Sequence, residues 1–191
     1  GLVRLNFLTD QDTPSENGII LWDDVNGYPV VSKDGVFRQI VLEDGHYNGE
    51  ITSDVTAAAA DTAYALTYTS TLSEGITNGT PASRIVFAEA GYYQVSFSAQ
   101  ISSSSSSSVK FYFWPRVNGV DAAGQTMINT LHNNGASVVT SRTAAFEVSA
   151  GDYLEAMWAV DSTSGFLEAA SATAFAPAAP ASTISIVRLH G

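Results

Sequence analysis

The sequence predicts an all-β protein, built as a sandwich or barrel of many short antiparallel strands. Apolar and polar residues alternate along the clearest segments, GYYQVSFSAQI (91–101) and VKFYFWPRV (109–117). A period of two is typical of strands that are buried on one face only. Turn dipeptides such as Asn118-Gly119 and Gly151-Asp152 follow at short intervals, which favours hairpins over a parallel βαβ arrangement.

The same patterns predict further strands. They cover residues 3–8, 18–22, 28–32, 35–42, 62–69, 84–88, 136–148, 152–160, 165–170 and 183–189. Asp44-Gly45 and Asn48-Gly49 are interpreted as additional turns. The alanine-rich stretches 53–65 and 169–181 are interrupted by Thr and Asp or by proline, so a regular helix is not expected in either. The serine run 102–108 is predicted to be a mobile surface loop between two strong strands.

Composition changes near residue 50 and predicts two parts. We expect residues 1–50 to form a β-rich N-terminal docking segment, 51–60 a linker, and 61–191 the main domain. A segment of ~50 residues is too small to bury much of a core by itself, so its apolar side chains need a partner surface. The candidate docking residues are Leu5, Phe7, Ile20, Trp22, Val30, Phe37 and Ile40.

The charge balance excludes two classes of partner. The chain of 191 residues carries 19 acidic and 8 basic side chains, for a formal net charge of −11, and the basic residues are scattered singly. Clusters of cations that would bind phosphates are missing, so neither nucleic acid nor an anionic membrane is an expected partner. The N-terminus does not resemble a signal peptide, and no stretch reaches the ~20 apolar residues that span a bilayer. We expect a soluble protein.

The low content of charge also points to self-association. Charged residues make up only 14% of the chain, whereas a typical soluble protein has about 25%. A surface that is partly covered by other subunits, and otherwise built from Ser, Thr, Asn and Ala, accounts for the difference. We therefore expect an oligomer.

No combination of residues indicates catalysis, a metal site or a cofactor. Carboxylates such as Asp152 and Glu155 lie near turns, where Asp caps the local backbone, so they are not expected to be the paired acids of a glycosidase. There is no cysteine and no G-x-S-x-G motif, and no histidine has a partner at metal-ligand spacing. A glycan-stacking platform is an alternative role for the aromatic residues, although their place within strands favours core or subunit packing. The histidines are His46, His132 and His190.

Four segments beyond Asp61 carry a resemblance to a known family. In order they contain an AG-x-Y turn before a strand, an NG turn after an aromatic strand, and an AGDY sequence that opens a strand ending near a tryptophan. This combination resembles the trimeric jelly-roll domain of the complement globular head and tumour necrosis factor type, in the version carried by virion proteins of tailed bacteriophages. Residues 18–35 are similar to short β units near the N-termini of phage virion proteins. The four segments are 83–101, 111–121, 146–162 and 176–189.

The resemblance implies a homotrimer without catalytic residues. Each subunit would hold one antiparallel jelly-roll β-sandwich preceded by a small N-terminal β-hairpin segment. It would lie on the outer surface of a phage particle, docked to the major capsid protein or to another virion protein. Because the chain has no long repetitive shaft and no coiled-coil heptads, a capsid cement or decoration role is favoured. Two alternatives stay open: a tail or fibre component whose head binds the host surface, including a host glycan, and a carbohydrate-binding module.

Overall fold

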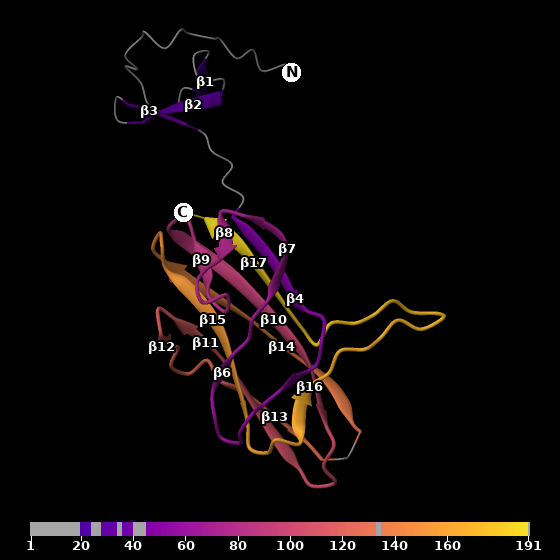
Figure 1. Cartoon of the computed structure of the whole chain (residues 1–191). Helices are drawn as coiled ribbons and strands as arrows, with labels where there is room; N and C mark the ends of the chain where they lie inside the picture. The colour runs from indigo at the N-terminus through magenta and orange to yellow at the C-terminus, as the bar shows by residue number, and fades with distance from the viewer. Residues whose placement is uncertain (1–19, 24–27, 34–35, 40–44, 133–134, 191) are drawn as a thin grey trace. The chain divides into compact units, whose positions relative to one another are not determined.

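The computed structural model describes residues 20–23, 28–33, 36–39, 45–132 and 135–190. The chain divides into two compact units, 1–43 and 44–191 (Figure 1). In the first unit β1 (Ile20–Asp23), β2 (Tyr28–Lys33) and β3 (Val36–Gln39) form a three-stranded antiparallel sheet in that order. The prediction of a small N-terminal hairpin unit is confirmed.

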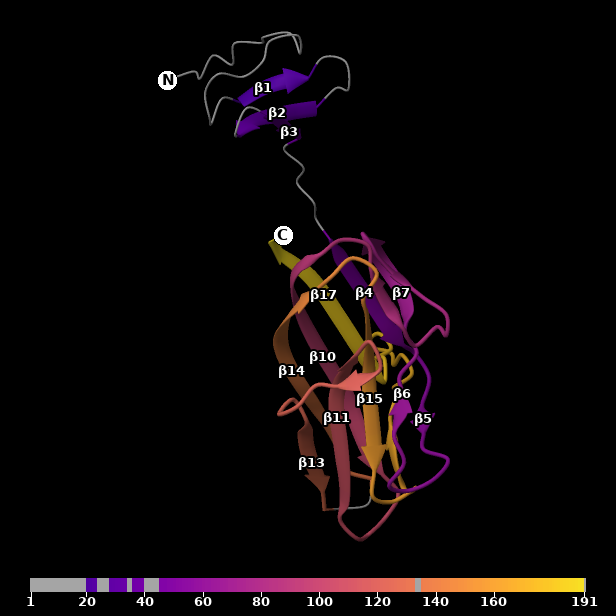
Figure 2. The same cartoon turned by 90° about the vertical axis from the view of Figure 1, so that its left-hand side faces the viewer.

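The second unit contains two antiparallel sheets that form a sandwich (Figure 2). The β10 sheet has the order β5-β16-β10-β17-β4-β7, and β14 pairs with the other edge of β10. The β11 sheet has the order β12-β11-β15-β9-β8, with β13 paired to β11 and β6 paired to β15. The four long strands of the sandwich up to residue 160, namely β10, β11, β14 and β15, alternate between the two sheets in chain order, which is the crossover pattern of a jelly roll.

The strands have the following bounds. In the β10 sheet they are β4 (His46–Ile51), β5 (Val55–Thr56), β7 (Thr69–Glu74), β10 (Gly91–Ser103), β14 (Ser137–Val148), β16 (Gly165–Leu167) and β17 (Ser182–His190). In the β11 sheet they are β6 (Tyr64–Ala65), β8 (Ile76–Asn78), β9 (Ile85–Phe87), β11 (Val109–Val117), β12 (Val120–Asp121), β13 (Met127–Leu131) and β15 (Tyr153–Val160).

Aromatic and β-branched side chains fill the space between the two sheets. The alternating apolar residues of β10 and β11 face inward, as the period of two predicts, and they are buried except for Phe97 and Val117, which are partly buried against the core. Ring contacts connect the layers, with centroids 5.2 Å apart for Phe97 and Phe113. Trp158 of β15 is among the largest fully buried side chains. The all-β jelly-roll sandwich predicted from the sequence is therefore the observed fold.

The boundary between the two parts lies earlier than the sequence suggests. β4 falls within the predicted N-terminal segment 1–50, yet it is an interior strand of the jelly roll, paired with β17 on one side and β7 on the other. The predicted linker 51–60 contains β5, which pairs with β16, and the buried Ala57. The jelly-roll unit thus begins at Asp44 and not at residue 61.

Gly49 explains why β4 was missed. Asn48-Gly49 has the composition of a turn, but Gly49 is buried in the middle of the strand. A Cβ atom at this position would lie 2.8 Å from Cε1 of Tyr47 and 2.9 Å from Cβ of Tyr68. Glycine is required here because two tyrosine side chains approach the backbone closely, which is a use of glycine within strands that sequence alone does not distinguish from a turn.

The serine run is only partly a loop. β10 continues through Ser103, and both Ser102 and Ser103 are 2% exposed. Ser102 pairs with Ser137 of β14 and with Phe166 of β16, so small side chains are buried where β10 has a neighbour on each side. The connection between β10 and β11 is therefore shorter than predicted and covers residues 104–108.

The alanine-rich stretches contain no helix. Residues 53–65 include β5 and β6. Within 169–181, residues 170–179 leave the sandwich as an arm closed by a bridge between Ala170 and Ala179 (Figure 1). Phe175 in this arm is 92% exposed.

We expect Gly151→Val to lower the stability of the jelly roll by about 1–3 kcal/mol. Gly151 has φ +85°, and its N–H donates to the carbonyl oxygen of Phe87 over 2.8 Å. A Cβ atom at Gly151 would meet nothing within 4 Å, so the penalty comes from the left-handed backbone alone. Thermal unfolding monitored by circular dichroism measures the effect. Ser105→Gly in the loop 104–108 is the matched control, and equal losses of stability in both variants would contradict this explanation.

Candidate functional site

The predicted docking residues lie in the N-terminal unit. Ile20 and Trp22 belong to β1, Val30 to β2 and Phe37 to β3. Four of the seven predicted docking residues therefore lie in one small sheet. The register pairs Trp22 with Pro29, and Val30 with Leu21 and Gln39. The remaining three fall outside the described residues. They are Leu5, Phe7 and Ile40.

The carboxylates of the jelly roll have structural partners. Asp152 accepts hydrogen bonds from the Ser149 N–H and from Nδ2 of Asn118, each over 2.7 Å, and these donors hold the pKa of Asp152 below its ordinary value. Asp152 is thus the turn cap that the sequence predicts. Glu155 differs from the prediction: it lies within β15, is buried, and accepts a hydrogen bond from Oγ of Ser83 over 3.0 Å.

The described residues contain no group of three His, Asp or Glu side chains that could hold a metal ion. His132 lies at the end of β13, where its Nδ1 is 2.9 Å from Oγ of Ser108. In the same part of the chain, no helix has the length and apolar character needed to cross a membrane.

The solvent side of the β10 sheet carries a broad surface without charge, which we call the uncharged face. It extends across four adjacent strands, β14, β10, β17 and β4 (Figure 1). Ser96 lies at its centre, opposite Thr143 on one side and Ser185 on the other. The uncharged face consists of Asn48, Gln94, Ser96, Ser98, Gln100, Ser141, Thr143, Ala145, Thr183 and Ser185.

Hydroxyl groups on the uncharged face bond to one another. Oγ of Ser96 lies 3.0 Å from Oγ1 of Thr143, and Oγ of Ser98 lies 2.7 Å from Oγ1 of Thr183. These two pairs join four of the ten residues of the face within one subunit. A partner that covers the face would therefore have to supply hydrogen bonds to the remaining polar side chains.

Exposed apolar side chains border the uncharged face. Val139 at one end is 63% exposed, and Val187 at the other is 47% exposed. Tyr92 lies beyond Gln94 in β10 and donates its hydroxyl hydrogen bond to Glu147, which raises the pKa of Tyr92. The centre of the surface is thus neutral and its border is apolar, with charge confined to the periphery. Protein interfaces show the same depletion of charge at their cores.

The β14 side of the sandwich is also incompletely closed. Within the described residues β14 pairs with β10 alone, so its outer edge has no strand neighbour. An apolar pocket lies between the sheets at this edge, and its lining includes Phe97, Phe113 and Phe146. An edge strand next to an open apolar pocket is a surface that a partner normally covers.

Sequence reasoning missed this surface although its signal was present. The alternation in the segment 91–101 predicts that its polar positions face solvent, and nothing more about them. All of them are uncharged, from Gln94 to Gln100, and the same holds for Ser141 and Thr143. Only the register between strands shows that these neutral positions combine into one face.

Comparison with known proteins identifies the fold. No family model matches the sequence, and no curated protein sequence matches it. Among solved structures, crystalline murine APRIL at pH 8.5 aligns with a TM-score of 0.50 and 9% identity, covering 76% of this chain and 99% of that one. The Eiger TNF protein from S. frugiperda aligns with a TM-score of 0.51 and 12% identity, covering 77% of this chain and 92% of that one. The second unit is therefore a jelly roll of the tumour necrosis factor type.

Proposed function

We propose that this chain is a non-enzymatic structural protein that forms a homotrimer on the outer surface of a tailed-bacteriophage particle. The jelly-roll unit would trimerise, and the N-terminal unit would dock to the major capsid protein or to another virion protein. The function is that of a capsid cement or decoration protein. The observation that carries the proposal is the uncharged face of the β10 sheet, which shares with interface cores the depletion of charged side chains.

Self-association explains the surface composition better than a free monomer does. In a monomer the centre of this face would be exposed to solvent, where charged side chains help to keep a protein soluble, yet it carries none. An identical subunit that packs its β14 edge against this face would cover both the neutral surface and the apolar pocket. Such a contact joins two different patches, and three copies close into a ring when each is rotated by a third of a turn. The jelly roll of the tumour necrosis factor type supports this arrangement, since the family resemblance implies a trimer.

Docking through the N-terminal unit is supported by its size. Residues 1–43 form a compact unit separate from the jelly roll, with three short strands in the described part. A sheet of this size is marginal without an additional surface to pack against. Addition of a strand to an exposed sheet edge is a suitable mode of binding, because main-chain hydrogen bonds supply the contact.

A tail or fibre component whose head binds a host-surface glycan is the second candidate. It would share the fold, the trimer and the absence of catalysis. The observation that favours it is an aromatic groove on the β11 sheet, on the opposite side of the sandwich from the uncharged face.

The proposed assembly is tested by light scattering coupled to size exclusion. We expect a mass near three times the 20.1 kDa of the chain at micromolar concentration. Electron microscopy of the assembled particle, with an antibody against residues 45–132, then locates the protein on the capsid or on the tail. A monomer in solution would refute the trimer, whereas a trimer on the tail would support the fibre alternative.

A further inference from the structure

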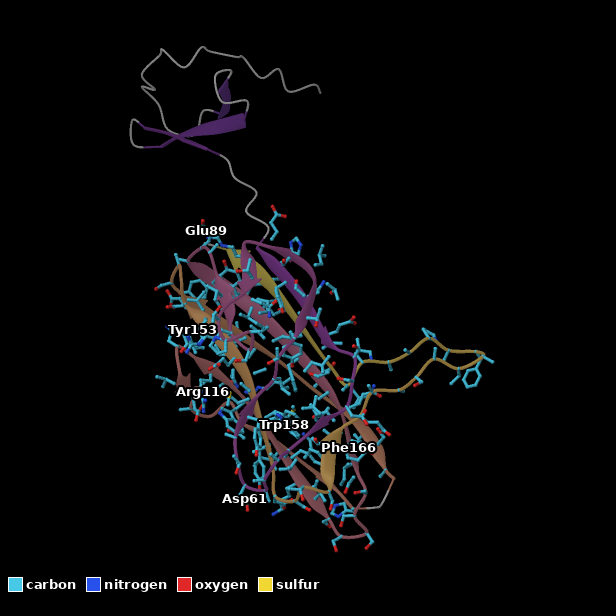
Figure 3. The ribbon with its side chains drawn as sticks, viewed as in Figure 1. Asp61, Glu89, Arg116, Tyr153, Trp158 and Phe166 are labelled. Atoms are coloured by element: carbon cyan, nitrogen blue, oxygen red, sulfur yellow. The ribbon has the colours of Figure 1, made fainter. Side chains whose placement is uncertain are left out.

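A groove crosses the outer face of the β11 sheet. Tyr112 and Trp114 of β11 form its floor, and the segments around Asp61 and around residues 121–126 form its walls. The groove has a volume of ≈430 Å³, within the usual range of about 300–1,000 Å³ for small-molecule sites. Figure 3 shows Arg116 and Tyr153 close together along this side of the unit, with Asp61 farther along it.

The strand pattern explains why the two aromatic side chains share the groove. Phe111 and Phe113 of β11 face the core and are buried, so the alternate residues Tyr112 and Trp114 face outward. Two residues along a strand are separated by about 7 Å. Both rings remain half-buried, and the small residues Ala63 and Ala159 beside them leave space above the floor. The result is an aromatic platform with low walls.

Asp121 is held at one end of this platform with an oxygen available for a ligand. Its Oδ1 accepts hydrogen bonds from Nε1 of Trp114 over 2.8 Å and from Nε of Arg116 over 2.7 Å. These two donors hold the pKa of Asp121 below its ordinary value, with Arg116 as the larger cause. Because the carboxylate is ionised and no described residue donates to its Oδ2, this oxygen can accept a hydrogen bond from a ligand at the edge of the groove. Asp61 supplies a second exposed carboxylate at the opposite wall, from a backbone with φ 54°.

We propose that this groove binds a neutral saccharide. The C–H face of a pyranose ring would stack on the electron-rich faces of Tyr112 and Trp114, while its hydroxyl groups would donate hydrogen bonds to Asp121 and Asp61. Acidic sugars are disfavoured because Arg116 is already paired with Asp121 and both walls carry a carboxylate. A quaternary ammonium ligand would need rings arranged around it as a cage, whereas these two rings lie side by side on one strand.

The proposal does not depend on trimerisation or on the particle, because every residue of the groove belongs to one subunit. The test therefore uses the full chain with ¹⁵N-labelled indoles, titrated to millimolar concentrations of maltohexaose, cellohexaose or a neutral galactan hexamer. Trp114 reports on the groove, and the buried Trp158 reports on the integrity of the fold. We expect at least one saccharide to shift the Trp114 indole signal and to leave that of Trp158 unchanged.

Variants assign the shift to the groove. Tyr112→Ala is expected to weaken binding about tenfold, as loss of one stacked ring implies, and Asp121→Asn to weaken it similarly, both with an unchanged Trp158 signal. Phe175→Ala removes an exposed aromatic ring elsewhere and is expected to leave binding unchanged. The proposal is overturned if no saccharide shifts Trp114, if Phe175→Ala abolishes the shift, or if choline chloride shifts Trp114 where the saccharides do not.

Discussion

Replacing Thr143 by lysine is expected to convert the proposed trimer into a monomer of 20.1 kDa. Thr143 is exposed in the single subunit and lies opposite Ser96 at the centre of the uncharged face. The isolated subunit can therefore accommodate a lysine in solvent without repacking its core. In the trimer the same charge would be buried without a partner, at a penalty of about 3–5 kcal/mol at each interface. Light scattering over a range of concentrations measures the loss of association.

Two further variants separate burial from a general effect of charge. Ala145→Glu introduces the opposite charge on the same face and is expected to dissociate the trimer as well. Thr77→Lys places a lysine at an exposed position of β8 in the other sheet and should leave a trimer. If Thr143→Lys and Ala145→Glu both remain trimeric and fold normally, the uncharged face is not the subunit interface.

Removal of residues 1–60 is expected to unfold the jelly roll, whereas removal of residues 1–43 is expected to leave it folded. The longer deletion removes β4, which pairs with both β17 and β7, and with it the fully buried Tyr47. Loss of one large buried aromatic side chain costs about 3–5 kcal/mol, and the loss of two ladders of strand hydrogen bonds adds to it. A domain has a total stability of about 5–15 kcal/mol, so the shorter chain is not expected to fold.

Circular dichroism and the dispersion of amide NMR signals distinguish the two truncated chains. The chain 44–191 should also remain trimeric but fail to bind particles that lack the native protein, because the docking unit is gone. Binding equal to that of the full chain would show that the jelly roll itself contacts the particle. A folded 61–191 chain would contradict the assignment of β4 to the interior of the β10 sheet.

Local patterns in the sequence were sufficient to predict the class of fold. The alternation in 91–101 and 109–117 reflects a property of each strand by itself, namely that one of its faces is buried. Turn residues such as Asn118 and Gly151 are equally local: both adopt positive φ in the structure, as their residue types favour. The low content of charged residues indicated a covered surface without showing where it lies.

The uncharged face was formed by the tertiary structure. Ser96 and Thr143 are 47 residues apart in sequence, and only the pairing of β10 with β14 places them side by side. Gly49 has the composition of a turn, but two tyrosine side chains, one of them from the distant Tyr68, require glycine inside a strand. The groove likewise depends on residues near Asp61 that lie against β11. Sequence periodicity records which side of a strand faces the core, whereas neighbouring strands, and the surfaces they form together, arise from contacts between residues far apart in the chain.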